Sequence, residues 1–67
     1  MDNEMRNLYS YMLEEFPNVF TTHFSRDLLY NILEESQKID NMTERCEWLA
    51  KILPQVQLKE IRNVLLR

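Results

Sequence analysis

Apolar residues recur at three- and four-residue steps along most of the chain, which is the spacing of one face of an α-helix. This pattern predicts four helices, over about residues 2–16, 24–38, 43–53 and 57–67. Their expected inward-facing stripes are Met5, Leu8, Tyr9, Met12, Leu13 and Phe16; Phe24, Leu28, Leu29, Ile32 and Leu33; Cys46, Leu49, Ile52 and Leu53; and Leu58, Ile61, Val64 and Leu65. The sequence therefore predicts an all-α fold, a compact bundle of three to four short helices in a single domain.

Prolines and small polar residues mark the ends of these helices. Pro17 and Pro54 are expected to end the first and third helices, because the residue before a proline avoids helical geometry. Thr22 or Ser25 can serve as the N-cap of the second helix, and Asn41 as that of the third. The chain contains no glycine, which disfavours the tight hairpin turns and phosphate-binding loops that depend on it. Short polar turns between helices are what the composition favours.

The chain also shows an internal similarity. Phe16-Pro17-Asn18-Val19 recurs as Leu53-Pro54-Gln55-Val56, thirty-seven residues later, and residues 29–33 match residues 61–65 at an offset of thirty-two. The first half would therefore carry five extra residues within Phe20 to Ser25. Each half reads as a helix, a proline turn and a second helix. A duplication explains this pattern, but so does the general likeness of any two amphipathic helices that flank a proline.

Charge is spread unevenly over the two halves. The formal net charge is −3, yet residues 1–40 carry eight acidic and three basic side chains, whereas residues 41–67 carry three acidic and five basic ones. An acidic chain repels the phosphate backbone, so nucleic acid is a disfavoured partner. The uneven charge could steer a partner protein or could simply be a solvated surface. A DNA-binding repressor stays as an alternative through Lys59, Arg62, Asn63 and Arg67 of the fourth helix.

No apolar run approaches the ~20 residues that a membrane-spanning helix needs. The N-terminus does not read as a signal peptide, and the single cysteine, Cys46, has no internal disulfide partner. We therefore expect an intracellular, cytoplasmic protein, for which a nuclear location is an alternative, with no membrane segment.

Few residues suit catalysis or metal binding. His23 is the only histidine and Cys46 the only cysteine, so a catalytic triad or a zinc site within one chain is disfavoured. We expect Cys46 to be a core residue and His23 a surface or capping residue. The adjacent pairs Glu14-Glu15 and Glu34-Glu35 point about 100° apart on a helix and do not converge. We predict that the chain is not an enzyme and binds no cofactor and no metal.

The chain carries more large apolar side chains than one small core readily hides. Val19 and Phe20 are expected to fold over the core as a lid, while Tyr11, Tyr30, Trp48 and Leu66 fall outside the main stripes. Aromatic residues and methionine are enriched at the centres of protein interfaces. We therefore interpret part of this surplus as a binding surface for another protein, although a core with extra inward positions is the alternative. A second copy of the chain, in a two-fold homodimer, could also cover it.

The unit Met12-Leu13-Glu14-Glu15-Phe16-Pro17, followed by a helix rich in Ile and Leu, resembles the start of a CUE domain, a ubiquitin-binding relative of the three-helix UBA fold. The second proline turn is similar to the same signature. The resemblance implies a three-helix bundle in which the Phe-Pro turn and a dileucine contact ubiquitin. It nominates Met12, Phe16 and Pro17, and it places Ile52 and Leu53 at the dileucine position. The extra residues after Pro17 depart from the family pattern.

Together these observations predict a non-enzymatic protein–protein interaction module. The predicted partner-binding residues are Met12, Phe16, Pro17, Tyr30, Trp48, Ile52, Leu53 and Leu66. The partner would be ubiquitin or a ubiquitin-like protein if the module is an adaptor. It would be a dedicated target if the chain is a small stand-alone regulator or inhibitor of the phage or bacterial type. A chain complete from Met1 would favour the regulator, and a fragment of a longer protein would favour the adaptor.

Overall fold

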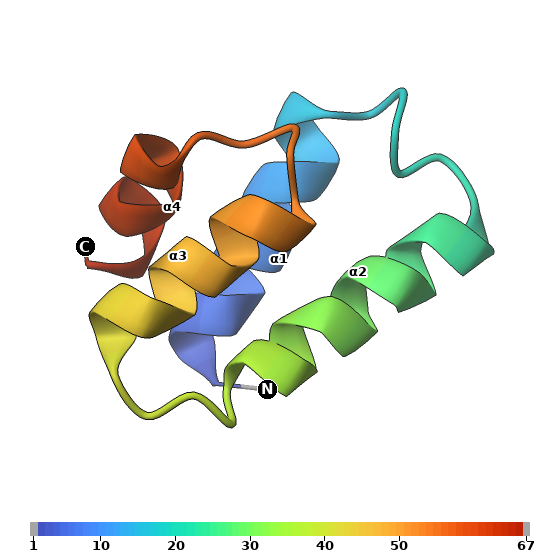
Figure 1. Cartoon of the computed structure of the whole chain (residues 1–67). Helices are drawn as coiled ribbons and strands as arrows, with labels where there is room; N and C mark the ends of the chain where they lie inside the picture. The colour runs from blue at the N-terminus through green and yellow to red at the C-terminus, as the bar shows by residue number, and fades with distance from the viewer. Residues whose placement is uncertain (1, 67) are drawn as a thin grey trace.

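The computed structural model describes residues 2–66 and folds them into four α-helices with no strand (Figure 1). The helices are α1 (Asn3–Glu15), α2 (His23–Ser36), α3 (Met42–Ile52) and α4 (Leu58–Leu65). The all-α fold predicted from the apolar spacing is confirmed. The observed helices begin and end within about two residues of the predicted bounds, and the predicted end of the fourth helix at Arg67 lies outside the described residues.

Side-chain caps explain where three of the helices begin. The Asp2 carboxylate accepts a hydrogen bond from the Met5 backbone N–H at 3.0 Å, and the Asn41 side chain accepts one from that of Glu44 at the same distance. Thr22, not Ser25, is the N-cap of α2, and the two side chains form a reciprocal capping box. Each cap satisfies a backbone donor that the first helical turn leaves unpaired.

The two proline turns have nearly the same backbone geometry. Phe16 and Leu53 leave the helical region, with φ and ψ of −127° and 56° and of −111° and 77°, as the following proline requires. Three residues further on, Val19 and Val56 donate backbone hydrogen bonds to the Phe16 and Leu53 carbonyls at 3.0 and 3.1 Å. No residue from 2 to 66 has a positive φ, which accords with a chain that contains no glycine.

The helices pack as a closed ring. α1 lies against α2 and α4, and α3 lies against the same two helices, while neither α1 and α3 nor α2 and α4 pack directly within the described part of the chain. Both proline turns lie at the upper end of the molecule in Figure 1, and the α2–α3 connection lies at the lower end. Each helix therefore has two neighbours, and the side turned away from both is open to solvent.

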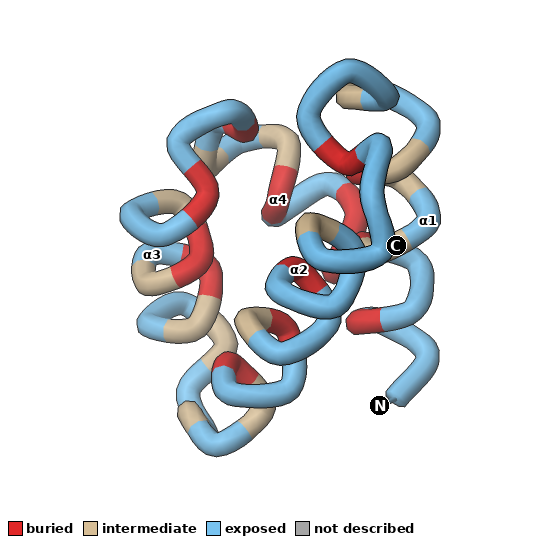
Figure 2. Tube along the Cα trace, turned by 90° about the vertical axis from the view of Figure 1, so that its right-hand side faces the viewer, coloured by how far each residue is buried: buried red, intermediate tan, exposed pale blue. Residues whose placement is uncertain are grey.

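The core occupies the centre of this ring, where buried positions of the helices face one another (Figure 2). Its buried residues are Met5, Leu8, Met12, Phe20, Leu29, Leu33, Cys46, Leu49, Leu53, Val56, Ile61, Val64 and Leu65. Cys46 is buried, which confirms its prediction as a core residue. The predicted lid is confirmed for Phe20 but not for Val19, which is exposed.

Two of the predicted stripes were too wide. Phe24 and Leu28 of α2 and Ile52 of α3 are exposed, so their assignment to the core was wrong. The inner line of α2 consists of Leu29, Leu33 and Ser36, which face the ring. Phe24, Leu28 and Ile32 form a neighbouring line one helical step away. Because α2 packs only against α1 and α3, this second line is largely uncovered.

Candidate protein-interaction surface

An apolar hollow lies where α2 meets the two proline turns. It has a volume of about 170 Å³ and is lined by Val19, Phe20, Ser25, Leu28, Leu29, Ile32, Ile52, Leu53 and Gln55. Seven of these nine side chains are hydrocarbon or aromatic, and none carries a charge. Leu29, Leu53 and Phe20 are buried and form its floor, whereas Val19, Leu28 and Ile52 are exposed and form its rim. We call these nine residues the apolar hollow.

The hollow results from a difference between the two similar halves of the chain. Val19 and Val56 occupy the same place in their turns, yet Val19 is 40% exposed and Val56 only 2% exposed. The loop between α3 and α4 spans residues 53–57, so α4 begins almost directly after Val56. The loop between α1 and α2 spans residues 16–22 and is two residues longer. This longer path leaves Val19 at the rim.

The remaining extra residues of the first half lengthen α2 itself. With residues 29–33 aligned to residues 61–65, the start of α4 at Leu58 corresponds to Arg26, whereas α2 begins three residues earlier at His23. This additional turn, His23 to Ser25, carries Phe24, which is 78% exposed. Phe24 precedes Leu28 of the rim by four residues, so the two side chains lie on the same face of α2. An aromatic side chain therefore stands beside the hollow.

Arg26 fixes the loop that carries this rim. Its Nε donates to the Phe20 carbonyl at 3.3 Å and links the first full turn of α2 back to the α1–α2 loop. Phe20 also donates its backbone N–H to the Phe16 carbonyl at 3.2 Å. With Phe20 anchored on both its amide and its carbonyl, Val19 is held in place at the edge of the hollow.

The predicted contact residues are distributed over the molecule rather than gathered in one patch. Ile52 and Leu53 are the two that line the apolar hollow, where they meet the residues that follow Pro17. Met12 and Leu53 are buried; Phe16 and Trp48 are half-buried against the core; and Pro17, Tyr30, Ile52 and Leu66 are exposed. Met12 is wholly enclosed, so it has no surface to offer a partner, and we assign it to the core. Leu53 forms the floor of the hollow and not its rim.

Tyr30 and Leu66 lie outside the hollow. The Tyr30 ring packs edge-on against Tyr9 of α1, with ring centroids 6.3 Å apart and an interplanar angle of 83°. The nearby Glu34 carboxylate raises the pKa of Tyr30 above its ordinary value, because it accepts a hydrogen bond from the neutral phenol and repels the phenolate. Leu66 is 65% exposed at the end of α4, a helix that does not pack against α2. These two residues do not extend the same surface.

Sequence reasoning did not predict Val19, Leu28 or Phe24 as contact residues. Val19 and Leu28 belong to the rim of the hollow, and Phe24 stands beside it. A helical stripe on the sequence cannot distinguish a core position from an exposed one beside it. One sequence signal was available. The first half carries five more residues than the second, within residues 20–25. This is the place where the first half is open and the second half is closed. Ser25 and Gln55, the polar residues of the hollow, had no sequence signal.

The rest of the described surface offers little for chemistry. Cys46 is buried in the core, and this burial raises the pKa of its thiol, which disfavours the reactive thiolate. His23 is exposed in the first turn of α2, which fits the predicted surface role, whereas the capping role belongs to Thr22. Among residues 2–66, no three side chains of His, Cys, Asp or Glu gather as a metal site would require. A polar depression lined by Asn7, Ser10, Tyr11, Glu14 and Glu15 lies along α1 alone.

None of the described helices is both long enough and apolar enough to cross a membrane. No protein-family model matches the chain, and comparisons with curated proteins and with solved structures return no match. The likeness to CUE domains thus rests on the sequence features alone, and the apolar hollow is the feature from which a function has to be inferred.

Proposed function

We propose that the chain is a non-enzymatic protein-interaction module that binds a partner protein through the apolar hollow. The observation that carries this proposal is the combination of an uncharged hollow with exposed Leu28, Ile52 and Phe24 around it. Large exposed apolar side chains that gather at one place, rather than singly, mark binding surfaces on small soluble proteins. Leu29 and Leu53 form the buried floor of the hollow and offer hydrocarbon contacts to a partner side chain.

The expected affinity follows from the size of this surface. Burial of one Leu, Ile or Phe side chain stabilises a complex by about 1.5–3 kcal/mol, so these three side chains supply roughly 5–9 kcal/mol. Association costs about 4 kcal/mol or more in lost translational and rotational freedom. The balance of at most about 5 kcal/mol corresponds to a dissociation constant no tighter than about 0.2 mM from these three side chains. Such a module would exchange its partner rapidly.

A ubiquitin-type adaptor is the first version of this function that we propose to test. It is supported by the meeting of the residues after Phe16-Pro17 with Ile52 and Leu53, at the position of the dileucine, in one hollow. The ring of four helices differs from the three-helix bundle that the resemblance implies. In this version Val19, Leu28 and Ile52 replace Met12 as the contact residues.

A titration of ¹⁵N-labelled chain with unlabelled ubiquitin, followed by amide chemical shifts, tests this version. We expect shifts concentrated at residues 18–20, at Leu28 and at residues 52–55. Leu28→Ser should abolish them, while Leu66→Ser, which also removes an exposed leucine, should leave them unchanged. A spectrum that is silent up to millimolar ubiquitin excludes the adaptor version and leaves a dedicated partner.

The stand-alone regulator is the version that a silent titration would favour. A chain tagged at its C-terminus should then retain a target protein in a pull-down when complexes are chemically cross-linked first, and the target should be lost with Leu28→Ser and kept with Leu66→Ser. Retention that is equal for both variants would mean that the hollow is not the binding surface. Failure to retain any protein above background, together with the silent titration, would contradict the module itself.

A further inference from the structure

We infer that the apolar hollow binds a second copy of this chain, with Phe24 of each copy inserted into the hollow of the other across a two-fold axis. This inference rests on the proposed function, because it names the partner of the same surface. It goes further in assigning the inserted residue and the symmetry. Phe24 would be the residue that fills the hollow, and Val19, Leu28 and Ile52 would be the residues that enclose it.

The size of the hollow matches an aromatic ring. Its volume is about 170 Å³, and an apolar cavity of about 150 Å³ is known to accept benzene. The floor of Leu29 and Leu53 offers the hydrocarbon contacts that a phenyl ring requires. Because no lining side chain is charged, insertion of the ring leaves no ion without water. The lining therefore suits an apolar guest better than a polar one.

The projecting residue lies on α2 beside the hollow. Phe24 is 78% exposed and stands one helical turn before Leu28 of the rim. An interface about a two-fold axis uses the same patch on both chains, so each contact between residues i and j occurs twice. The surface around the hollow holds both Phe24 and the hollow that would receive it, so it meets this requirement. A partner of a different kind would need only one of these two features.

The local charges permit the same arrangement. Insertion of Phe24 lays the first turns of α2 on the rim of the other copy. These turns carry Arg26 and Asp27, one charge of each sign, so they bring no net charge to the rim. Docking of α2 therefore meets no net electrostatic repulsion there.

Sedimentation equilibrium of the full chain between about 10 μM and 1 mM tests the inference. We expect a monomer–dimer equilibrium, with Phe24→Ser weakening the dimer by about 10- to 100-fold for each of the two inserted rings, or about 100- to 10,000-fold in all. Leu66→Ser removes a side chain of similar exposure from α4 and should leave the equilibrium unchanged. Circular dichroism should show the helical content of both variants to be that of the parent chain, since both side chains are largely in solvent.

A mixture of two further variants distinguishes the insertion of Phe24 from a general loss of surface hydrophobicity. Phe24→Asp removes the inserted ring, and Ile52→Lys places an amine at the hollow, so each variant alone should be monomeric. In the mixture, the intact Phe24 of one variant can enter the intact hollow of the other, and the introduced carboxylate and amine can pair at the second contact. We therefore expect a heterodimer in the mixture where neither variant forms a homodimer.

Three results would overturn the inference. One is a chain that stays monomeric up to 1 mM, and another is a dimer that Phe24→Ser leaves as stable as before. The third is a mixture in which no heterodimer forms. A monomeric chain that nevertheless binds ubiquitin or a retained target through Leu28 would overturn the second copy as partner and leave the proposed function intact. A dimer that depends on Phe24, with no other partner, supports the inference.

Discussion

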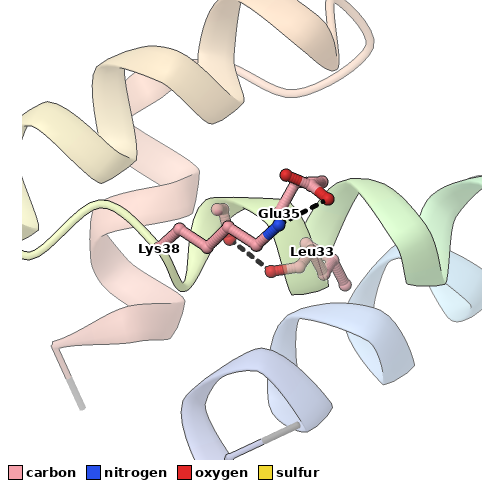
Figure 3. Close-up of polar contacts among 4 residues, drawn as sticks. Leu33, Glu35 and Lys38 are labelled. Carbon is pink, nitrogen blue, oxygen red and sulfur yellow. Dashed lines mark hydrogen bonds and ion pairs between the residues drawn. The ribbon is translucent and has the colours of Figure 1, made fainter.

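The hydroxyl oxygen of Ser36 lies 3.2 Å from the sulfur of Met5, so the last turn of α2 contacts the first turn of α1 inside the core. Ser36 is the one buried polar residue among those that the structure describes. Its hydroxyl also donates to the Leu33 carbonyl. Figure 3 shows this end of α2, where Lys38 and Glu35 form an exposed ion pair at 3.0 Å. One hydroxyl proton serves one acceptor at a time, and the contact with Met5 is therefore mainly one of packing.

Ser36 should be sensitive both to the loss of its hydroxyl and to an increase in size. The Gln37 N–H bonds to the Glu34 carbonyl rather than to that of Leu33, so Ser36→Ala removes the donor to the buried Leu33 carbonyl and should destabilise the chain by about 1–3 kcal/mol. Ser36→Leu removes the same donor and also has to push α1 and α2 apart, so it should cost a further ~1–3 kcal/mol. Urea unfolding followed by circular dichroism distinguishes the two. Equal effects of Ala and Leu would mean that α1 and α2 are not closely packed at this point.

The inner lines of the helices should carry most of the stability. Leu33 and Leu49 are fully buried, and truncation of either to Ala should cost about 2–5 kcal/mol, which can unfold a domain of this size. Phe24→Ala removes a larger side chain from solvent and should change stability by less than about 0.5 kcal/mol. Thermal unfolding at low protein concentration, where any dimer dissociates, provides the comparison. Cooperative unfolding of Leu33→Ala at the parent temperature would contradict the observed core.

The sequence predicted the helices well because their signals are local. The apolar period, the caps at Thr22 and Asn41 and the two prolines each act within about four residues, so they can be read without tertiary structure. Even the burial of Cys46 followed from its place between Leu49 and the third-helix start. The accuracy of these predictions reflects a chain whose local and tertiary preferences agree.

The candidate site was harder to predict because it depends on which helices are neighbours. Phe24, Leu28 and Leu33 belong to one stripe in the sequence, and only the ring arrangement exposes the first two while it buries the third. Met12 was predicted as a contact residue from its place before Phe16-Pro17, yet α1 turns it inward. Ile52 was predicted as both a core and a contact residue, and the structure places it at the rim of the hollow.

Trp48 is one of the partly buried side chains that pack against the core, and its truncation should test that packing. Because the indole is half-buried, Trp48→Ala should destabilise the chain by about 1–3 kcal/mol. Tyr30→Ala loses the edge-on contact with Tyr9 and should cost about 0.5–1.5 kcal/mol. Urea titrations of the two variants check the order. A smaller effect for Trp48→Ala than for Tyr30→Ala would place the indole on the surface.

The capping box of α2 should control the position of Phe24. Thr22 accepts from the Ser25 backbone N–H at 3.1 Å and holds the first turn of the helix, which carries the exposed ring. Thr22→Ala should cost about 1 kcal/mol and let that turn fray, whereas Thr22→Ser should retain the cap. Amide hydrogen exchange at residues 24–27 measures the fraying. Unchanged exchange in Thr22→Ala would show that the Arg26 contact with Phe20 alone holds this turn.

Stability should fall in alkaline solution because of Cys46. Burial raises the pKa of its thiol above the ordinary value of 9.0, so the folded chain holds the proton more tightly than the unfolded chain does. This contribution is fully present below pH 9.0, the pKa of the unfolded thiol, and is lost as the pH rises through the higher pKa of the folded state, at up to about 1.4 kcal/mol per pH unit. Unfolding free energies measured between pH 7 and 10.5 for the parent chain and for Cys46→Ala isolate the effect. Ala lacks the titrating group, so its curve should be flatter above pH 9 even though its stability at pH 7 is lower. Parallel curves would mean that the thiol reaches solvent in the folded chain, and Cys46 would then also react with a thiol reagent without prior unfolding.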